Sequence, residues 1–319
     1  MSARLALIGG RGYTGAELLA LLAKHPELEL AVASSGSEAG QPIQKTVPGW
    51  PDANTTFSGL SPDQVAQVTA EVWLLALPNG ASAPWVEAIT AAHPDAVIVD
   101  LGADYRFDPD WVYGLTEWNR PALTSARRIA NPGCYATAAQ LALLPLRDQL
   151  ARPAVVFGVS GYSGAGRTPS PRNDPQRLAD NLIPYSLTGH VHEEEISVHL
   201  ARPVRFHPHV ASFFRGLSLT ISINLTEVLS AEQLYDQFMD CYAEAPLIKV
   251  SVDIPEVQQV AARPGAIIGG FVIDARNPLR LTLVAVLDNL LKGAASQAMQ
   301  NINLAMGWPE LTGIEAPHD

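Results

Sequence analysis

A glycine-rich turn near the N-terminus constrains the fold more than any other segment of this sequence. The turn, Gly9–Gly15, reads GGRGYTG and follows the apolar run Leu5–Ile8. In the next segment, Thr14–Lys24, leucines recur at helical spacing. A strand, a glycine turn and a helix in this order let the backbone approach a ligand phosphate at the helix N-terminus. The spacing GxxGxxG is weak evidence by itself, so the prediction of a dinucleotide-binding turn depends on its position between strand and helix.

The first third of the chain continues this alternation of short apolar runs and helical patterns. Further predicted strands are 28–33, 72–77, 97–101 and 128–130. Strands that alternate with helices predict a parallel, doubly wound sheet. The first domain is therefore predicted to be a Rossmann-type dinucleotide-binding domain.

After about residue 150 the pattern changes to that of a half-buried sheet. Apolar and polar residues alternate without a break through Gly216–Leu225, which is typical of a strand in an antiparallel sheet covered on one side. Other predicted strands are 155–159, 204–210, 248–252, 267–275 and 279–287. Ser230 and Gln233 have capping-box spacing and predict a helix that runs to about Ala245.

These patterns predict an α/β chain with two domains. The dinucleotide-binding domain spans residues 1–133, and a C-terminal helical segment at about 291–319 returns to it. The second domain, residues 134–290, is predicted to be an α+β catalytic domain with a largely antiparallel sheet. Residues 164–188 are rich in Pro, Arg, Asn and Asp and predict a long loop, which is more often functional than accidental.

Composition and charge exclude several classes of protein. With 47% hydrophobic residues among 319, the chain is not disordered, and 32 acidic against 21 basic residues argue against nucleic acid or an anionic membrane as partner. No apolar run has the length of a membrane span or of a signal-peptide core. Two cysteines cannot build a disulfide framework. We therefore expect a cytoplasmic protein in a reducing compartment.

The residues after the second predicted strand bear on the choice of cofactor. An NAD-binding domain usually has an acidic residue there, which binds the ribose hydroxyls. This chain has Ser34-Ser35-Gly36-Ser37 instead. No carboxylate repels a 2′-phosphate, and three hydroxyls can donate to one. We predict NADP as the cofactor.

A cysteine at a predicted helix start is the candidate nucleophile. Asn131-Pro132-Gly133 ends a strand, and good helix formers follow Cys134. In the first turn of a helix, unpaired amides and the helix dipole favour a thiolate. The second cysteine, Cys241, lies within the helix that starts at Ser230 and is predicted to be buried and inert.

Two pairs of histidines are candidates for the proton donor that such a nucleophile needs. They are His190 with His192, and His207 with His209. Two residues apart on a strand, either pair would share one face and could bind a metal. Because no third ligand has suitable spacing, we predict no metal site.

Several longer segments together resemble the N-acetyl-gamma-glutamyl-phosphate reductases of the semialdehyde dehydrogenase family. They are Gly9–Gly15, Asp100–Arg106, Tyr113–Arg120, Asn131–Pro145, Ser160–Arg167, Gly189–His192 and Asp288–Ala295. The cysteine segment is the most specific of these and the glycine turn the least. The resemblance runs nearly from end to end.

The resemblance implies a NADPH-dependent reduction of N-acetyl-gamma-glutamyl phosphate to N-acetylglutamate semialdehyde and phosphate, through a cysteine thioester, in arginine biosynthesis. It implies that Cys134 is the nucleophile and His192 the general acid/base, ranked above His209. The residues it implies for cofactor binding are Gly9, Gly12, Tyr13, Thr14, Gly15, Ser34, Ser35, Gly164 and Asn289. Those it implies for substrate binding are Arg106, Arg167 and His190. It also implies a homo-oligomer, a dimer or a tetramer.

The chain departs from the pattern of these reductases in three places. Gly36 stands where the family commonly has Arg, so one contact to a 2′-phosphate is missing. Val191 stands where the family has the Arg of His-Arg-His. Glu193-Glu194-Glu195 replaces Thr-Pro-Glu and adds acid near an anionic substrate. Each departure removes a cation or adds an anion.

Three other functions remain open at the level of the sequence. A related reductase acts on a carrier-bound acyl phosphate in lysine biosynthesis, but a net charge of −11 and four lysines argue against docking of an acidic carrier. Aspartate-semialdehyde dehydrogenase shares the chemistry, although its motifs match less well. A regulatory protein that senses NADP without turnover would leave the cysteine and the His-x-His segment unexplained.

Overall fold

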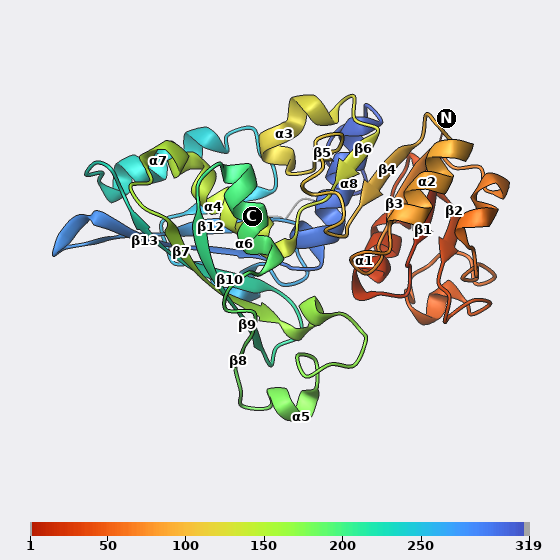
Figure 1. The fold of residues 1–319 in the computed structure, drawn as a ribbon, viewed down its shortest axis with the longest axis horizontal. Helices are drawn as coiled ribbons and strands as arrows, with labels where there is room; N and C mark the ends of the chain where they lie inside the picture. Colours follow the sequence, from red (N-terminus) through yellow and green to blue (C-terminus); the bar gives the residue numbers. More distant parts are fainter. Residues whose placement is uncertain (1, 316–319) are drawn as a thin grey trace. The chain divides into compact units, whose positions relative to one another are not determined.

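The computed structural model describes residues 2–315. The chain forms two compact units. The first comprises the residues up to Gly133 together with Ala294–Glu315, and the second comprises Cys134–Gly293 (Figure 1). The two units are called below the N-terminal unit and, after the role that the sequence predicts for the second, the catalytic unit.

The N-terminal unit is built on a six-stranded parallel sheet in the order β2-β1-β3-β4-β6-β5. Its strands are β1 (Ala3–Ile8), β2 (Leu28–Ser34), β3 (Val72–Leu75), β4 (Val97–Asp100), β5 (Val112–Tyr113) and β6 (Arg128–Ala130). The predicted doubly wound parallel sheet is confirmed. The two-residue edge strand β5 was not predicted, because it is too short to carry a periodic pattern.

Four α-helices belong to the N-terminal unit. They are α1 (Tyr13–Leu22), α2 (Ala83–Ala92), α3 (Thr116–Leu123) and α8 (Ser296–Ala305), with short 3₁₀ turns at Ile43–Lys45 and Pro62–Gln67. The last helix is buried although it is rich in amides, because these amides have partners: Asn301 Nδ2 donates to the carbonyl of Gly114 at 2.8 Å and Oδ1 accepts from Thr116 at 2.9 Å. A π-helical turn, Leu291–Ala295, precedes α8. Residues 316–319 of the predicted C-terminal segment lie outside the described residues.

The catalytic unit contains a seven-stranded mixed sheet in the order β11-β12-β13-β10-β7-β9-β8. Its strands are β7 (Ala154–Gly161), β8 (Ile183–Pro184), β9 (Val204–Ala211), β10 (Leu217–Asn224), β11 (Ile248–Ser251), β12 (Ala266–Asp274) and β13 (Asn277–Leu287). The pairs β7/β9 and β11/β12 are parallel, and the other four pairs are antiparallel. The prediction of a largely antiparallel sheet is confirmed.

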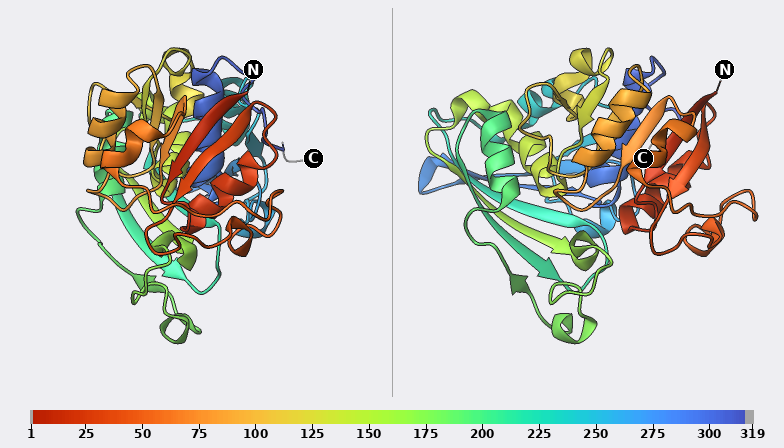
Figure 2. Two further views of the ribbon diagram at one scale, coloured as in Figure 1. Left: turned by 90° about the vertical axis from the view of Figure 1, so that its right-hand side faces the viewer. Right: turned by 45° about the vertical axis from the view of Figure 1, so that its right-hand side comes forward.

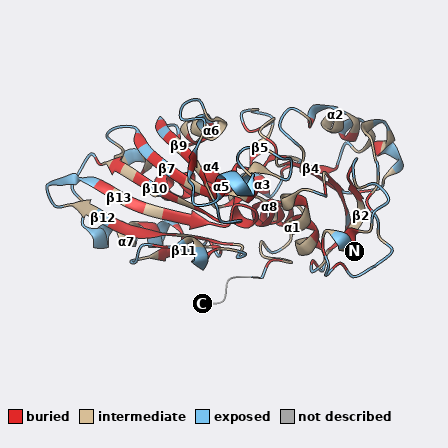
Figure 3. Ribbon diagram, turned by 90° about the horizontal axis from the view of Figure 1, so that it is seen from below, coloured by how far each residue is buried: buried red, intermediate tan, exposed pale blue. Residues whose placement is uncertain are grey.

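One face of this sheet is covered by helices. They are α4 (Cys134–Leu143), α6 (Val191–Leu200) and α7 (Ala231–Cys241), of which α4 and α6 contact each other. On β10 the four apolar residues that alternate from Leu217 to Ile223 are fully buried. On the other face, Val155 and Phe157 of the interior strand β7 are 36% and 40% exposed, and Figure 3 shows exposed positions interrupting the buried strands. The sheet therefore has one open face.

The second cysteine is not where the sequence placed it. Ser230 and Gln233 form the predicted capping box, with Ser230 Oγ accepting from Gln233 N at 3.1 Å. Cys241, the last residue of α7, is exposed rather than buried. The inward positions belong to Leu234, Phe238 and Tyr242, one turn apart, so Cys241 faces away from them.

The long segment 164–188 is partly structured. It contains the single-turn helix α5 (Pro175–Leu178) and the short strand β8, and it extends beyond the ends of β8 and β9 (Figures 1 and 2). A 3₁₀ turn, Tyr162–Ala165, leads into it. The remaining short helices of the unit are the 3₁₀ turns Leu144–Gln149 and Val257–Gln259. Among the helices of residues 2–315, none is long and apolar enough to cross a membrane.

Candidate active site

The three glycines of the turn in the N-terminal unit differ in what a side chain at each position would meet. Gly9 has φ +92°, and a Cβ there would lie 2.3 Å from the carbonyl oxygen of Ala76. A Cβ on Gly15 would lie 2.6 Å from the carbonyl oxygen of Gly10. At Gly12, the N-cap of α1, a Cβ would have only the Gly9 oxygen nearby, at 3.7 Å. The first and third glycines therefore shape the turn, and the middle one leaves the start of α1 open.

Tyr13 and Thr14 are the first two residues of α1, as the predicted cofactor turn requires. The first N–H groups of a helix have no acceptor within the helix and attract an anion. The turn is also tied to the end of β2, because the Gly9 and Gly10 amides both donate to the carbonyl of Ser34, at 3.0 and 2.9 Å. The structure therefore brings the two sequence segments predicted to bind a cofactor side by side.

The serines after β2 are less available than the sequence suggests. Ser34 and Ser35 are both 4% exposed. The hydroxyl of Ser34 donates to the carbonyl of Leu60 at 3.3 Å, and that of Ser35 accepts from the amide of Glu38 at 3.3 Å. Gly36 is exposed, with open space around it. Arg11, in the glycine turn next to this corner, is an exposed cation that the sequence reasoning missed.

Arg106 lies in the N-terminal unit and is only 6% exposed. Its Nε donates to the carbonyl of Asn131 and its Nη2 to that of Leu101, both at 2.9 Å. These contacts hold the turn that immediately precedes Cys134. Its predicted role in binding a substrate anion stays a prediction.

In the catalytic unit, Cys134 is the first residue of α4, as predicted. Its side chain is partly buried, whereas the nine residues that follow it in the helix are all buried. A thiol at this position is next to the unpaired first-turn amides and the positive end of the helix dipole, which favour the thiolate. The structure therefore places the candidate nucleophile on a rigid helix start rather than on a loop.

Aromatic and imidazole rings gather around Tyr135, the residue that follows Cys134 in α4. The ring of Tyr135 lies 6.0 Å from that of His192, which lies 4.8 Å from that of His190. The ring of Tyr185 lies 5.6 Å from that of His190. These four residues, with Cys134, are called the thiol cluster below.

The two histidines of the thiol cluster do not lie on a strand. His190 is the N-cap of α6, and its Nδ1 accepts from the backbone amide of His192 at 3.0 Å. The helix α6 was not predicted, because its hydrophobic pattern is weak and Glu193 to Glu195 obscure it. Burial, followed by the nearby charge of Arg172, lowers the pKa of His190 to about 4. His190 is therefore a neutral ring at physiological pH.

The two tyrosines of the thiol cluster keep their protons. Burial raises the pKa of Tyr185 to about 12, and the negative charge that Cys134 can carry adds to the effect. Burial also raises the pKa of Tyr135 well above its usual value, with Tyr185 and Cys134 as further causes. Both phenols are therefore neutral hydrogen-bond donors at neutral pH. Neither tyrosine was predicted as a site residue. Tyr135 follows Cys134 in the sequence, whereas only the fold brings Tyr185 close to Cys134.

The structure separates the two histidine pairs. On β9, Phe206 points inward and contacts the rings of Tyr135 at 4.9 Å and His190 at 5.3 Å. Side chains alternate along a strand, so His207 and His209 point to the opposite face. The ring of His209 lies 4.4 Å from that of the exposed Phe157, and only its backbone carbonyl reaches the thiol cluster, by accepting from Tyr135 Oη at 2.8 Å. This arrangement supports the ranking of His192 above His209.

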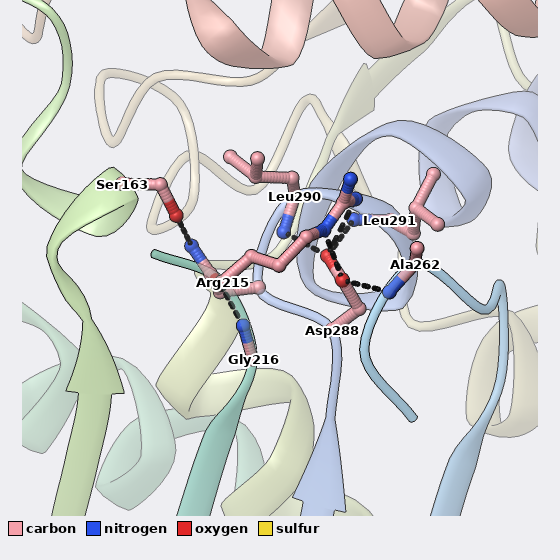
Figure 4. Close-up of polar contacts among 8 residues, drawn as sticks. Ser163, Arg215, Gly216, Ala262, Asp288, Leu290 and Leu291 are labelled. Atoms are coloured by element: carbon pink, nitrogen blue, oxygen red, sulfur yellow. Dashed lines mark hydrogen bonds and ion pairs between the residues drawn. The ribbon is translucent and has the colours of Figure 1, made fainter. Parts of the chain in front are cut away.

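The end of β13 is anchored by a buried ion pair (Figure 4). Asp288 is fully buried and accepts from Arg215 Nε at 2.5 Å and Nη2 at 3.1 Å. It also accepts from the amides of Ala262, Leu290 and Leu291, at 2.7 to 3.1 Å. These bonds fix the turn that carries Asn289 and Gly293.

The side-chain amide of Asn289 forms hydrogen bonds to two other segments of the catalytic unit. Its Oδ1 accepts from the amide of Gly216 at 2.7 Å, and its Nδ2 donates to Ser163 Oγ at 2.9 Å. Gly164 is exposed, and a Cβ there would lie 3.7 Å from Asn289 Nδ2. The two predicted cofactor contacts of this unit are therefore neighbours. Arg167, three residues further on, is exposed.

A hollow elsewhere in the catalytic unit has different chemistry from the thiol cluster. It measures about 710 Å³ and lies where α7 meets the strands β11 and β12, with Lys249, Asp253 and Arg263 in its lining. The described residues that line it include neither a cysteine nor a histidine. Within residues 2–315, no group of three or more His, Cys, Asp or Glu could hold a metal ion. The thiol cluster is therefore the candidate active site.

Comparisons with known proteins show the family to which this chain belongs. The family model for the NAD-binding domain of semialdehyde dehydrogenases matches residues 4–126, and the model for their dimerisation domain matches residues 134–289. The chain belongs to the semialdehyde dehydrogenase family, a family of oxidoreductases. Within it, the N-acetyl-gamma-glutamyl-phosphate reductase of Xanthomonas campestris pv. campestris is 51% identical over 97% of this chain and 98% of its own length. The resemblance seen in the sequence motifs is confirmed.

Solved structures confirm the fold. Aspartate semialdehyde dehydrogenase II of Vibrio cholerae matches with a TM-score of 0.77 at 21% identity, over 96% of this chain and 99% of that one. Aspartate semialdehyde dehydrogenase of Candida albicans, a structure with NADP, matches with a TM-score of 0.71 at 15% identity, over 96% of this chain and 99% of that one. At these identities the likeness concerns the architecture alone.

Proposed function

We propose that this chain catalyses the NADPH-dependent reduction of N-acetyl-gamma-glutamyl phosphate to N-acetylglutamate semialdehyde and phosphate. The observation that carries the proposal is the position of Cys134 at the start of α4, next to Tyr135, whose ring faces that of His192, with His190 beside it. The name shared by the reductase relatives supplies the substrate. Arginine biosynthesis in the cytoplasm is the setting that this substrate implies.

The residues of the N-terminal unit fit a dinucleotide. The open position of Gly12 leaves room for a phosphate at the start of α1, where a side chain would otherwise stand. Tyr13, Thr14 and Gly15 continue that first turn. The residues that directly follow β2, up to Ser37, include no acidic side chain, and this, together with the exposed cation of Arg11, favours a 2′-phosphate and thus NADP over NAD. In the catalytic unit, Gly164 and Asn289 are the residues proposed to meet the nicotinamide end.

The proposed chemistry begins with the Cys134 thiolate, which attacks the acyl carbon and displaces phosphate, so that a thioester forms. A bound nicotinamide dinucleotide supplies the hydride for the reduction. The first-turn amides of α4 stabilise the oxyanion that results. His192 protonates this oxyanion and takes the proton back as the carbon–sulfur bond breaks, which releases the aldehyde and restores the thiolate. The displaced phosphate takes its proton from solvent.

We infer that the enzyme is a homo-oligomer and that the open face of the catalytic sheet forms the contact between subunits. Val155 and Phe157 lie on the interior strand β7 and are nevertheless exposed. The match of this unit to a dimerisation domain supports the same inference. Light scattering of the wild type and of Phe157→Asp tests it, and a variant that keeps the wild-type mass argues against this face.

The reverse reaction tests the proposed function. NADP reduction by N-acetylglutamate semialdehyde should depend on inorganic phosphate and should greatly exceed the rate with aspartate semialdehyde. A higher rate with aspartate semialdehyde would assign the chain to that substrate, and no turnover with either would favour a carrier-bound substrate or a regulatory role. The same assay with NAD in place of NADP tests the cofactor.

A further inference from the structure

The loop 164–188 brings an arginine to the thiol cluster. The guanidinium carbon of Arg172 lies 4.8 Å from the centroid of the Tyr185 ring. The Tyr185 ring in turn lies 5.6 Å from that of His190, and His190 lies 4.8 Å from His192. The positive charge therefore stands at the edge of the thiol cluster, one ring away from the histidines.

The backbone around Arg172 is held in a defined shape. Asn173, the next residue, donates through Nδ2 to the carbonyls of Gly166 and Thr168, both at 2.8 Å. Its Oδ1 accepts from the amide of Ser170 at 2.7 Å. The amide of Arg172 donates to Ser170 Oγ at 3.3 Å. Because the side chain of Asn173 ties together this stretch of loop, Arg172 starts from a fixed position.

The charge of Arg172 is available to a ligand. Its side chain is exposed, and no carboxylate of residues 2–315 forms an ion pair with it. The side chain of Arg172 contacts the ring and the hydroxyl of Tyr185. A guanidinium stacked on an aromatic ring keeps its N–H edge free for a carboxylate or a phosphate.

Negative charge near the thiol cluster makes a local cation necessary for binding an anionic substrate. The first turn of α6, which carries His192, contains Glu193 and Glu194. The chain as a whole has a net charge of −11. An acyl phosphate that also carries a carboxylate is repelled by both, so a local positive charge is required to hold it at Cys134.

We propose that Arg172 is a substrate-binding residue, whose guanidinium binds an anionic group of the substrate beside the thiol cluster. The proposal rests on the function proposed above. The shared chemistry is that of an oxyanion, which the substrate presents both as its carboxylate and as its phosphate. Separate titrations of the two reverse substrates distinguish these sources.

The test compares Arg172→Gln and Arg172→Lys with the wild type in the reverse reaction. Arg177→Gln is the matched control, since Arg177 is an exposed arginine of the neighbouring helix α5. For Arg172→Gln, the KM should rise by about tenfold or more for inorganic phosphate or for N-acetylglutamate semialdehyde, with kcat within about threefold of wild type. The substrate whose KM rises identifies the anion.

Arg172→Lys should recover part of the loss, and Arg177→Gln should behave as wild type. Unchanged KM values for both substrates in Arg172→Gln would overturn the proposal.

A second measurement separates this proposal from the proposed function. If the wild type does not turn over N-acetylglutamate semialdehyde, the function fails, but the anion site can still be tested by alkylation of Cys134 in a Cys241→Ser background. Arg172 should accelerate the anionic reagent iodoacetate relative to neutral iodoacetamide. Arg172→Gln should then lower the ratio of the two rates by about threefold or more. An unchanged ratio would show that Arg172 binds no anion near the thiol.

Discussion

The backbone of Gly293 lies directly against Cys134. A methyl group on residue 293 would stand 2.6 Å from the Cβ of the cysteine and 3.2 Å from its Cα, closer than side chains pack. The turn cannot retreat easily, because the Asp288 carboxylate accepts five hydrogen bonds there and its backbone carbonyl accepts two more, from the amides of Leu291 at 3.2 Å and Gly293 at 2.9 Å. The fold therefore needs glycine at this position in order to place the thiol.

Gly293→Ala should move Cys134 and lower turnover more than stability. We expect kcat to fall by about tenfold or more, with a loss of about 1–3 kcal/mol in the free energy of unfolding. Steady-state rates and urea unfolding measure the two effects. Gly49→Ala, at an exposed glycine with nothing within 4 Å, is the control and should change neither. Wild-type kcat in Gly293→Ala would show that the close approach has no catalytic consequence.

Cys134→Ser should abolish turnover and leave the fold intact. A hydroxyl at the start of α4 is nearly isosteric but is not ionised at neutral pH, so the loss of kcat should exceed about a thousandfold. Circular dichroism and thermal unfolding should match the wild type. Cys241→Ser serves as the control, because that thiol is exposed at the end of α7, and it should keep full activity. The opposite result, an active Cys134→Ser, would remove the thioester from the mechanism.

His192→Asn and His209→Ala should behave differently, since their rings lie on opposite faces of the sheet. For His192→Asn we expect a fall in kcat of about a hundredfold or more, which is typical of a lost general acid/base. His209→Ala removes a ring that contacts Phe157 and leaves the backbone carbonyl that Tyr135 uses. His209→Ala should therefore change only the packing against Phe157 on the open face of the sheet, and kcat should stay near the wild-type value. A reversed order of the two kcat values would exchange their roles.

His190 should make the protein less stable as the pH falls from about 6.5 to about 4. Burial and Arg172 lower the pKa of His190 to about 4 in the folded state, whereas in the unfolded chain it has its ordinary pKa of about 6.5. Between these values the unfolded state binds a proton that the folded state does not, so stability is lost through this window and not further below it.

His190→Asn isolates this contribution. Asparagine has no titrating group, and its carbonyl oxygen can still cap the amide of His192 at the start of α6. Chemical unfolding at a series of pH values should show a shallower decline for the variant between pH 6.5 and pH 4. Parallel curves for the two proteins would mean that His190 keeps its ordinary pKa when folded.

The parts that the sequence predicted well are those whose signal is local. The alternation from Leu217 to Leu225 predicts β10 and its buried face, and the observed strand is Leu217–Asn224. The Ser230 capping box predicts where α7 begins. Cys134 at the helix start follows from the residues on either side of it. Where the local signal is weak, as in α6 and in the two-residue strand β5, the prediction failed.

Contacts between distant segments decided the rest. Whether His209 points to the thiol or away from it depends on the register of β9 against β7, where Val159 pairs with His209. Cys241 is exposed because Tyr242 takes the inward position that follows Phe238.

The sequence by itself determined the two sheets, the glycine turn and the position of Cys134 at a helix start, because backbone preference and hydrophobic period act over a few neighbouring residues. Only the tertiary structure decided what surrounds the thiol. Tyr185 and Arg172 reach the thiol cluster from a long loop that has no periodic pattern, and Gly293 reaches Cys134 from the end of β13. Packing between segments far apart in the chain sets those distances, and no local preference encodes them.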